Sequence, residues 1–333
     1  MHRIPVIALL VLLLSQSISA LAQSATPASS PSAPSAASGD FAGLVDIGGR
    51  SLYLECRGEG SPTVILVAGY RASARFWTDD LLQPDAPRQM AMPGVTEFTR
   101  VCTYDRPGTI ASIGEEILPS RSDPITQPRT SPEVVAELHA LLDAAQIPGP
   151  YVLVGHSMGG FFARLYAATY PDEVIGLVLV DAYSEQTEIL MTPERWEAMG
   201  ELSRELGSDT VVPIPGYGDL ETLPWGVDNA LMREAAAASP LPPMPLAVLA
   251  HGKAIVLLDD TRVFTTAEWE ALQQASYEAL ATLVPQARFT VASESGHDIH
   301  QDQPEVVIEA TRQVLEGVRT PETWYELASC CAT

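Results

Sequence analysis

A serine in the middle of the chain has the surroundings of a nucleophile. Residues 155–159 read Gly-His-Ser-Met-Gly, which fits G-x-S-x-G, and they follow the apolar run 151–154. A buried strand that turns at once into a helix needs small residues on both sides of the serine, because the two backbones come close together. The turn also aims the Met158 N–H and the helix N-terminus at an oxygen that gains negative charge during attack. The pattern therefore predicts a catalytic Ser157 rather than an ordinary tight turn, with Met158 as an oxyanion donor.

A serine hydroxyl attacks at neutral pH only when a base takes its proton, and histidine is the usual base. His297 is favoured among the six histidines because it lies in the loop between the last predicted strand and the last predicted helix. From there its side chain can reach the carboxyl edge of a sheet. His300 is the alternative base, or else it lines the entrance to the site. The other histidines have different expected places: His2 in the leader, His139 inside a helix, His156 in packing, and His251 in a structural hydrogen bond at a strand end.

Short apolar runs alternate with helical stretches along most of the chain, which predicts a sheet covered by helices on both faces. Several runs are apolar throughout, as strands buried on both faces must be. Three helices begin with a capping side chain three residues before a Glu, at Thr130, Thr265 and Asp302. The predicted strands are 51–56, 63–67, 100–104, 151–154, 175–180, 246–250 and 288–291, and the predicted helices are 132–145, 158–170, 267–284 and 304–318.

Residues 183–245 depart from this alternation. Prolines break them into short pieces, and a structureless loop of this length would be unusual, so we expect an inserted helical cap over the site. The cap contains several Met and Trp side chains, which favour an apolar or aromatic substrate unless they form the cap's own core. Its eleven acidic residues against three arginines argue against a polyanionic substrate.

The two ends of the chain differ from the rest. Residues 1–22 have the pattern of a secretory signal peptide, with an apolar run over 4–14 and cleavage expected after Ala22. That run is about half the length of a membrane-spanning helix, so we expect no stable membrane insertion. Residues 23–40 are rich in Ser, Ala and Pro and predict a flexible linker, and residues 321–333 a C-terminal tail. The expected location is secreted or periplasmic.

Composition limits the partners. The formal net charge of −23 argues against nucleic acid, and solubility outside the cell explains the acidity more simply than recognition of a cation. The four cysteines, Cys56, Cys102, Cys330 and Cys331, have no zinc-site spacing with histidines.

Over residues 44–318 the chain resembles the α/β-hydrolase superfamily, in the group with a cap after the sixth strand. The segments that carry this resemblance are Val67-Ala68-Gly69-Tyr70, Tyr104-Asp105-Arg106-Pro107-Gly108, Gly155-His156-Ser157-Met158-Gly159, Leu177-Val178-Leu179-Val180-Asp181 and Ser295-Gly296-His297 with Pro304. The resemblance implies an α/β fold: a mostly parallel sheet of about eight strands, with a core of 41–182 and 246–320. It also implies the Tyr70 N–H as the second oxyanion donor. Most relatives carry a His before that Gly, and Ala68 in its place predicts weaker bracing of the loop.

The resemblance implies an acid between the serine and the histidine along the chain. Relatives most often place it after the seventh strand, in H-G-x-x-D, but no acid stands there after Gly252. Asp181, at the end of the sixth strand, is favoured, and Asp259 and Asp260 remain alternatives. The simpler alternative is that the Asp181 carboxylate only caps backbone N–H groups.

Further expectations come from the same resemblance. The second and fourth strands are neighbours in this fold, which implies a disulfide between Cys56 and Cys102, with two free buried thiols as the alternative. The implied reaction is hydrolysis of a neutral carboxylic ester, a small-molecule substrate, through an acyl-enzyme and without a metal or organic cofactor. Amide cleavage, lactone opening, thioester hydrolysis and perhydrolysis share the machinery, and a noncatalytic binding protein is the alternative from another class. The oligomeric state stays open.

Overall fold

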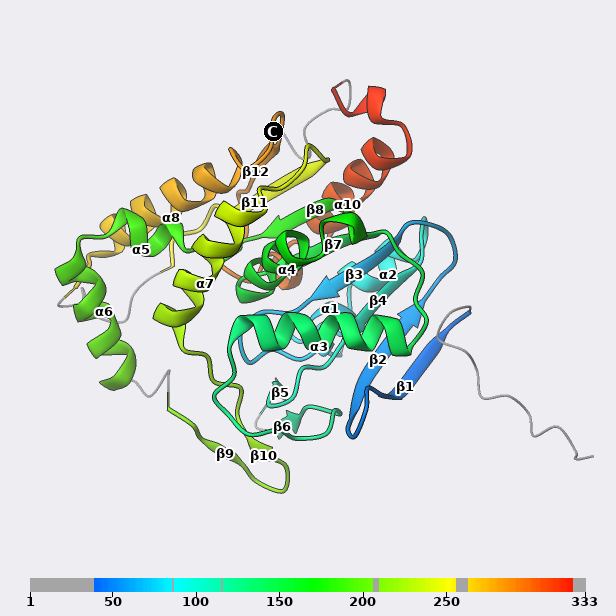
Figure 1. Ribbon diagram of the computed structural model, residues 1–333, viewed down its shortest axis with the longest axis horizontal. Coiled ribbons are helices and arrows are strands. Elements are labelled where there is room, and N and C mark those ends of the chain that lie inside the picture. The colour runs from blue at the N-terminus through cyan, green and yellow to red at the C-terminus, as the bar shows by residue number, and fades with distance from the viewer. Residues whose placement is uncertain (1–38, 86, 115, 206–209, 256–262, 326–333) are drawn as a thin grey trace, which may run out of the picture. The chain divides into compact units, whose positions relative to one another are not determined.

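An eight-stranded, mostly parallel sheet forms the centre of the protein (Figure 1), as the sequence predicts. The computed structural model describes residues 39–325 apart from 86, 115, 206–209 and 256–262, so the expected signal peptide and nearly all of the linker lie outside the described residues. The strand order is β1-β2-β4-β3-β7-β8-β11-β12, and only the pairs β1–β2 and β2–β4 are antiparallel. The strands are β1 Phe41–Asp46, β2 Ser51–Arg57, β3 Thr63–Val67, β4 Val101–Tyr104, β7 Tyr151–His156, β8 Val174–Val180, β11 Leu246–His251 and β12 Arg288–Ala292.

Helices cover both faces of this sheet because its central strands are apolar on both sides. In β7, Leu153 belongs to one buried cluster, whereas Val152 and Val154 belong to another, as the two-residue period of a strand requires. Helices α3, α4 and α8 contribute to the first cluster and α2 and α10 to the second. The helices are α1 Arg75–Thr78, α2 Ala91–Val95, α3 Ser131–Ala144, α4 Met158–Thr169, α5 Gln186–Leu190, α6 Pro193–Glu205, α7 Trp225–Ala238, α8 Thr266–Leu280, α9 Ile299–Asp302 and α10 Pro304–Arg319, with 3-10 turns at Pro171–Glu173 and Pro321–Tyr325. None of them is long and apolar enough to cross a lipid bilayer, within the described part of the chain.

The segment between β8 and β11 contains three helices, α5, α6 and α7, and two short strands, β9 Pro213–Ile214 and β10 Gly218–Asp219. A second small hairpin, β5 Ile110–Ile113 with β6 Glu116–Pro119, follows β4. In Figure 1 α6 and the β9–β10 hairpin extend away from the sheet, while α7 lies beside α4. The insertion thus has a mainly helical body that returns to the sheet through α7.

Two details differ from the expectations. Strand β1 was not predicted, because its half-buried and exposed residues alternate at the sheet edge and Ala42 and Gly43 resemble a continuation of the linker. Capping boxes are present at Thr130 and Thr265, as predicted. The predicted cap at Asp302 is wrong: α10 begins after Gln303, and the Asp302 carboxylate accepts a hydrogen bond from the Gly296 N–H at 2.8 Å instead.

Cys56 and Cys102 are joined as a disulfide, in agreement with the pairing that the resemblance implies. They lie opposite each other in the antiparallel register of β2 and β4, and both side chains are fully buried. The bridge connects the antiparallel edge of the sheet to its parallel centre. The two remaining cysteines, Cys330 and Cys331, lie outside the described residues.

We expect this disulfide to stabilise the fold by about 4 kcal/mol, because it closes a loop of 46 residues in the unfolded chain. Urea unfolding of the oxidised protein and of a Cys56→Ala, Cys102→Ala variant measures the difference. The Cys330→Ala, Cys331→Ala variant is the control and should unfold as the parent does. Equal unfolding free energies for the oxidised protein and the Cys56, Cys102 variant would show that the bridge adds nothing.

Candidate active site

Ser157 lies at a strained turn between β7 and α4. Its φ of 51° and ψ of −124° are unusual for a residue with a side chain. The turn is tight: a Cβ at Gly155 would lie 2.4 Å from the Gly159 carbonyl oxygen, and one at Gly159 would lie 2.1 Å from the Val67 carbonyl oxygen. Only glycine fits at 155 and 159, which explains the G-x-S-x-G spacing.

The turn holds Ser157 beside the end of the neighbouring strand β8. The Ser157 N–H donates to the carbonyl of Val180 at 3.0 Å, and Asp181 follows directly. The Asp181 N–H donates to the carbonyl of Leu249 on β11 at 2.8 Å, and its carboxylate is fully buried. Asp181 therefore lies at the carboxyl edge of the sheet, as expected, and next to Ser157.

His297 completes the cluster from the loop after β12. Its Nδ1 lies 2.6 Å from Asp181 Oδ2, and its carbonyl oxygen accepts from His156 Nε2 at 3.0 Å. Because His156 precedes Ser157, this second bond holds the His297 loop against the turn. With Nδ1 directed at a carboxylate, the imidazole leaves Nε2 for another partner, which is the arrangement a general base needs.

The electrostatics of this pair follow from burial and charge. Burial lowers the pKa of His297, but the hydrogen bond to Asp181 and the charges of Asp181 and Asp298 outweigh it and raise that pKa above its ordinary value. Burial raises the pKa of Asp181, yet its hydrogen bonds to His251 and His297 hold it at about 2. Asp181 is therefore ionised at neutral pH.

A second histidine shares the Asp181 carboxylate. His251 ends β11 with a side chain that is 3% exposed, and its Nδ1 lies 2.8 Å and 3.0 Å from the two Asp181 oxygens. Its Nε2 lies 3.0 Å from Glu270 Oε2 on α8. His251 thus makes the structural hydrogen bond expected of it, and its partner is the candidate acid Asp181. Nothing in the sequence near Glu270 indicates this contact. Asp259 and Asp260, the alternative acids, lie outside the described residues.

The loop after β3 lies against the turn. A Cβ at Gly69 would come within 3.2 Å of the Ser157 Cβ, so the backbone that leads to Tyr70 closely approaches the serine. Met158 is the first residue of α4. The loop that carries Tyr70 and the helix that begins with Met158 therefore both lie next to Ser157, and the roles of their N–H groups as oxyanion donors stay a prediction.

Arg106 braces this loop. Its Nη1 and Nη2 donate to the carbonyl oxygens of Ala68 and Gly69 at 2.8 Å and 2.5 Å. The prediction that Ala68 leaves the loop weakly braced is therefore wrong, because the support comes from a buried guanidinium far along the chain. Arg106 comes from one of the segments that carry the resemblance, but its neighbours in sequence give no sign of this role.

Glu221, from the segment between β8 and β11, is the counterion of Arg106. Arg106 Nε lies 2.6 Å from Glu221 Oε1, and both side chains are 0% exposed. The other oxygen, Oε2, accepts the Arg71 N–H at 2.7 Å. Burial alone would lower the pKa of Arg106, but the Glu221 charge raises it, so the guanidinium stays charged. Glu221 thus joins the loop after β3 to the insertion in two ways, through its ion pair with Arg106 and through the hydrogen bond from the Arg71 N–H.

Three half-buried aromatic rings pack edge-on against one another in a row. Tyr70 lies edge-on to Trp225 on α7 with ring centroids 5.0 Å apart, and Trp225 lies 5.1 Å from Tyr183 in the same way. The Tyr183 N–H donates to the Ser157 carbonyl at 3.0 Å. The five other Met and Trp side chains of the insertion pack elsewhere: Met191, Trp196 and Met199 with Phe264 and Leu272, and Met232 and Met244 in the main core.

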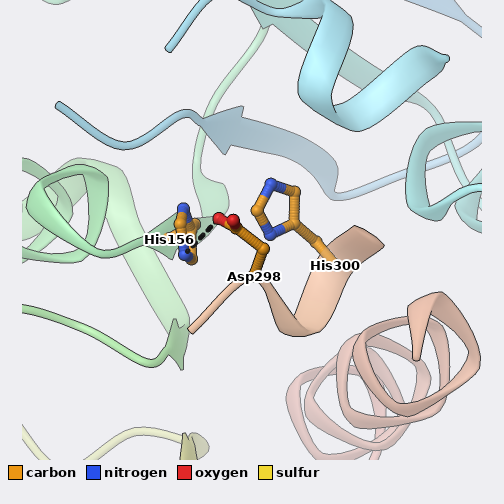
Figure 2. Close-up of side chains that lie close together, drawn as sticks. All are labelled: His156, Asp298 and His300. Atoms are coloured by element: carbon orange, nitrogen blue, oxygen red, sulfur yellow. Dashed lines mark ion pairs between the residues drawn. The ribbon is translucent and has the colours of Figure 1, made fainter. Parts of the chain in front are cut away.

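Behind the catalytic candidates, His156, Asp298 and His300 lie close together (Figure 2). Their ligand atoms are within 4.8 Å of one another, and this is the one such group of three or more among the described residues. A carbonyl oxygen only accepts, so His156 Nε2 carries the proton that it donates to His297, and a cation could take this nitrogen only by breaking that bond. Within the cluster, His156 thus holds the His297 loop against the turn.

His300 does not line the entrance. Its side chain is fully buried, with its ring 4.6 Å from Trp77 and 4.1 Å from His156. Burial, followed by the neighbouring histidines, lowers the pKa of His300 well below its usual value. Of the two candidate bases, only His297 has the acid on one ring nitrogen and a half-exposed side chain.

Comparison with known proteins agrees with this fold. Residues 64–310 match the sequence model of the alpha/beta hydrolase family, and the chain belongs to that family. It is 27% identical to the uncharacterized protein YqjL of Bacillus subtilis, over 75% of this chain and 82% of that one. It is 39% identical to Lipase LipV of Mycobacterium tuberculosis over 29% of this chain and 38% of that protein.

Two fungal relatives are much longer, and their matches cover 27% and 23% of their lengths. Among solved structures, alpha/beta hydrolase domain-containing protein 10 from mouse superposes with a TM-score of 0.51 at 16% identity, over 84% of this chain and 99% of that one. At this identity the similarity to the mouse protein shows a shared fold and nothing more.

The Arg106–Glu221 pair leads to a stability prediction. Glu221→Gln should lower the free energy of unfolding by about 3–5 kcal/mol, because it leaves a buried guanidinium without its counterion. Urea unfolding measures this loss. Glu309→Gln, which breaks the exposed pair with Arg312, is the matched control and should change stability little.

The double variant Arg106→Leu, Glu221→Leu removes both charges and should recover part of the loss. A Glu221→Gln variant as stable as the parent would contradict the proposed bracing.

Proposed function

We propose that this hydrolase cleaves neutral carboxylic esters through an acyl-enzyme on Ser157. The hydroxyl oxygen attacks the ester carbonyl while His297 Nε2 takes its proton, and the alkoxide leaves with that proton. Water, deprotonated by the same nitrogen, then releases the acid and restores Ser157. The N–H groups of Tyr70 and Met158 stabilise the negative oxygen of each tetrahedral intermediate. Asp181 orients His297 and stabilises its protonated form.

The observation that carries this proposal is the 2.6 Å contact between His297 Nδ1 and Asp181 Oδ2, next to a serine at a strained turn. A carboxylate that only capped backbone groups would not need an imidazole against it. A serine at the turn also favours acyl transfer over the epoxide and halide chemistry of relatives with an aspartate there.

The rings of Tyr70, Tyr183 and Trp225 favour an apolar or aromatic substrate portion. The acidic excess of the segment 183–245 disfavours polyanions. The relative named Lipase LipV is in keeping with ester chemistry. We further propose that residues 1–22 direct export, to which the Cys56–Cys102 disulfide is suited because such bonds persist in oxidising compartments.

A fluorophosphonate probe tests the nucleophile. The wild type should be labelled and Ser157→Ala should not, because the probe reacts with an activated serine hydroxyl. Ser112→Ala, on exposed strand β5, is the matched control and should be labelled like the wild type. Failure to label the wild type, or equal labelling of Ser157→Ala, would favour a noncatalytic binding protein with this fold.

A panel of p-nitrophenyl esters, anilides and lactones then separates the reactions that share this machinery. We expect esters to be turned over fastest. Much faster turnover of anilides or lactones would assign the chain to amide or lactone chemistry instead.

Asp181→Asn should lower kcat by about 10⁴, because an amide at this position favours the wrong imidazole tautomer. Steady-state kinetics on the best ester of the panel measure the effect. Asp259→Asn and Asp260→Asn are the matched comparisons and should be mild. A large loss in either of them together with a mild Asp181→Asn variant would move the acid to the segment after β11.

A further inference from the structure

His251 stands between two carboxylates, one on each side of its ring. Nδ1 lies 2.8 Å from Asp181 Oδ1, and Nε2 lies 3.0 Å from Glu270 Oε2. A neutral imidazole has one N–H and would turn a lone pair toward one of these anions, whereas the imidazolium donates to both. With both carboxylates ionised, the geometry therefore favours the charged form.

The surroundings fix the ring in this position. The His251 backbone N–H donates to Asp181 Oδ1 at 2.9 Å, and Glu270 Oε1 accepts the Ile255 N–H at 2.9 Å. From α8 the Tyr277 hydroxyl also comes within 3.4 Å of Nδ1, and its ring stands edge-on to the imidazole. The side chain of His251 is 3% exposed, so water screens its charge only slightly.

We propose that His251 is a positioning residue of this site: as an imidazolium it fixes Asp181 and limits how strongly Asp181 attracts the proton on His297. The inference rests on the proposed function for its catalytic meaning. Burial lowers the pKa of His251, but the hydrogen bonds and charges of Asp181 and Glu270 raise it to about 9.

The sign of the effect follows from the charges. His297 is a base only while neutral, and a cation close to Asp181 disfavours a second cation on His297. His251 thus lowers the pKa of His297 and extends activity toward lower pH. The groups that face the two histidines are Asp181 from the end of β8, Glu270 and Tyr277 from α8, Asp298 from the His297 loop, and the neutral His156 and His300 behind it.

NMR titration of the histidine rings tests this without any assay of activity. In the wild type His251 should carry protons on both ring nitrogens at pH 7.5. His251→Asn keeps an N–H donor for Asp181 but removes the charge, and should move the titration midpoint of His297 upward by at least about 0.5 pH unit. Glu270→Gln removes an anion while its amide oxygen still accepts from Nε2, and should move that midpoint downward.

His139→Asn is the matched control, because His139 also pairs with a glutamate, at 3.0 Å, but lies on α3 away from the site. It should leave the His297 midpoint unchanged. A neutral His251 at pH 7.5 would overturn the proposal. So would a His297 midpoint in His251→Asn within 0.2 pH unit of the wild type, or an upward shift in Glu270→Gln with His251 still protonated.

The fluorophosphonate labelling rate against pH links the result to function. In His251→Asn the acid side of this pH profile should shift to higher pH by the same amount as the His297 midpoint. At a pH well below that midpoint, labelling should therefore be at least about threefold slower than in the wild type. Absence of labelling in the wild type would refute the proposed function alone, because the NMR midpoints still decide the role of His251.

Discussion

The buried carboxylate of Asp181 determines how this site is assembled. A carboxylate with a fully buried side chain is costly unless its oxygens accept hydrogen bonds from well-placed donors. Here the donors come from the last residue of β11 and from the loop after β12, and the carboxylate itself follows β8. The carboxyl ends of three strands, β8, β11 and β12, must therefore lie at the same edge of the sheet. The parallel order β7-β8-β11-β12 brings them there, because parallel strands end on the same side.

A second buried charge has a similar role for the loop after β3. Arg106 satisfies the carbonyls of Ala68 and Gly69 only because Glu221 balances its charge. Since Glu221 belongs to the insertion, the loop next to Ser157 and the cap cannot be displaced independently without exposing or unpairing an ion. A change in the insertion that moved Glu221 would therefore also disturb the backbone of the loop after β3.

Sequence reasoning worked where local physics fixes the outcome. The strand, turn and helix around Ser157 were predictable because only glycine fits at 155 and 159, and the central strands because both their faces are buried. Edge strand β1 has neither feature. The partnership of Arg106 with Glu221 spans 115 positions, and Glu270 meets His251 only because α8 packs on β11, so neither contact has a local signature. His300 was misjudged because its loop position says nothing about Trp77 beneath it.

The distribution of exposure within the Asp181 cluster fits its chemistry. His297 has a side chain that is 40% exposed, whereas those of Asp181 and His251 are 0% and 3% exposed. In the proposed mechanism, hydrolysis of the acyl-enzyme needs water at His297, whereas water around Asp181 would weaken its hydrogen bond to the imidazole. With His251 protonated and Glu270 and Asp181 ionised, the cluster carries one net negative charge when His297 is neutral and none when it is protonated. In the proposed mechanism, proton transfer from Ser157 to His297 makes this cluster neutral and moves the negative charge to the substrate oxygen, where the proposed N–H donors stabilise it.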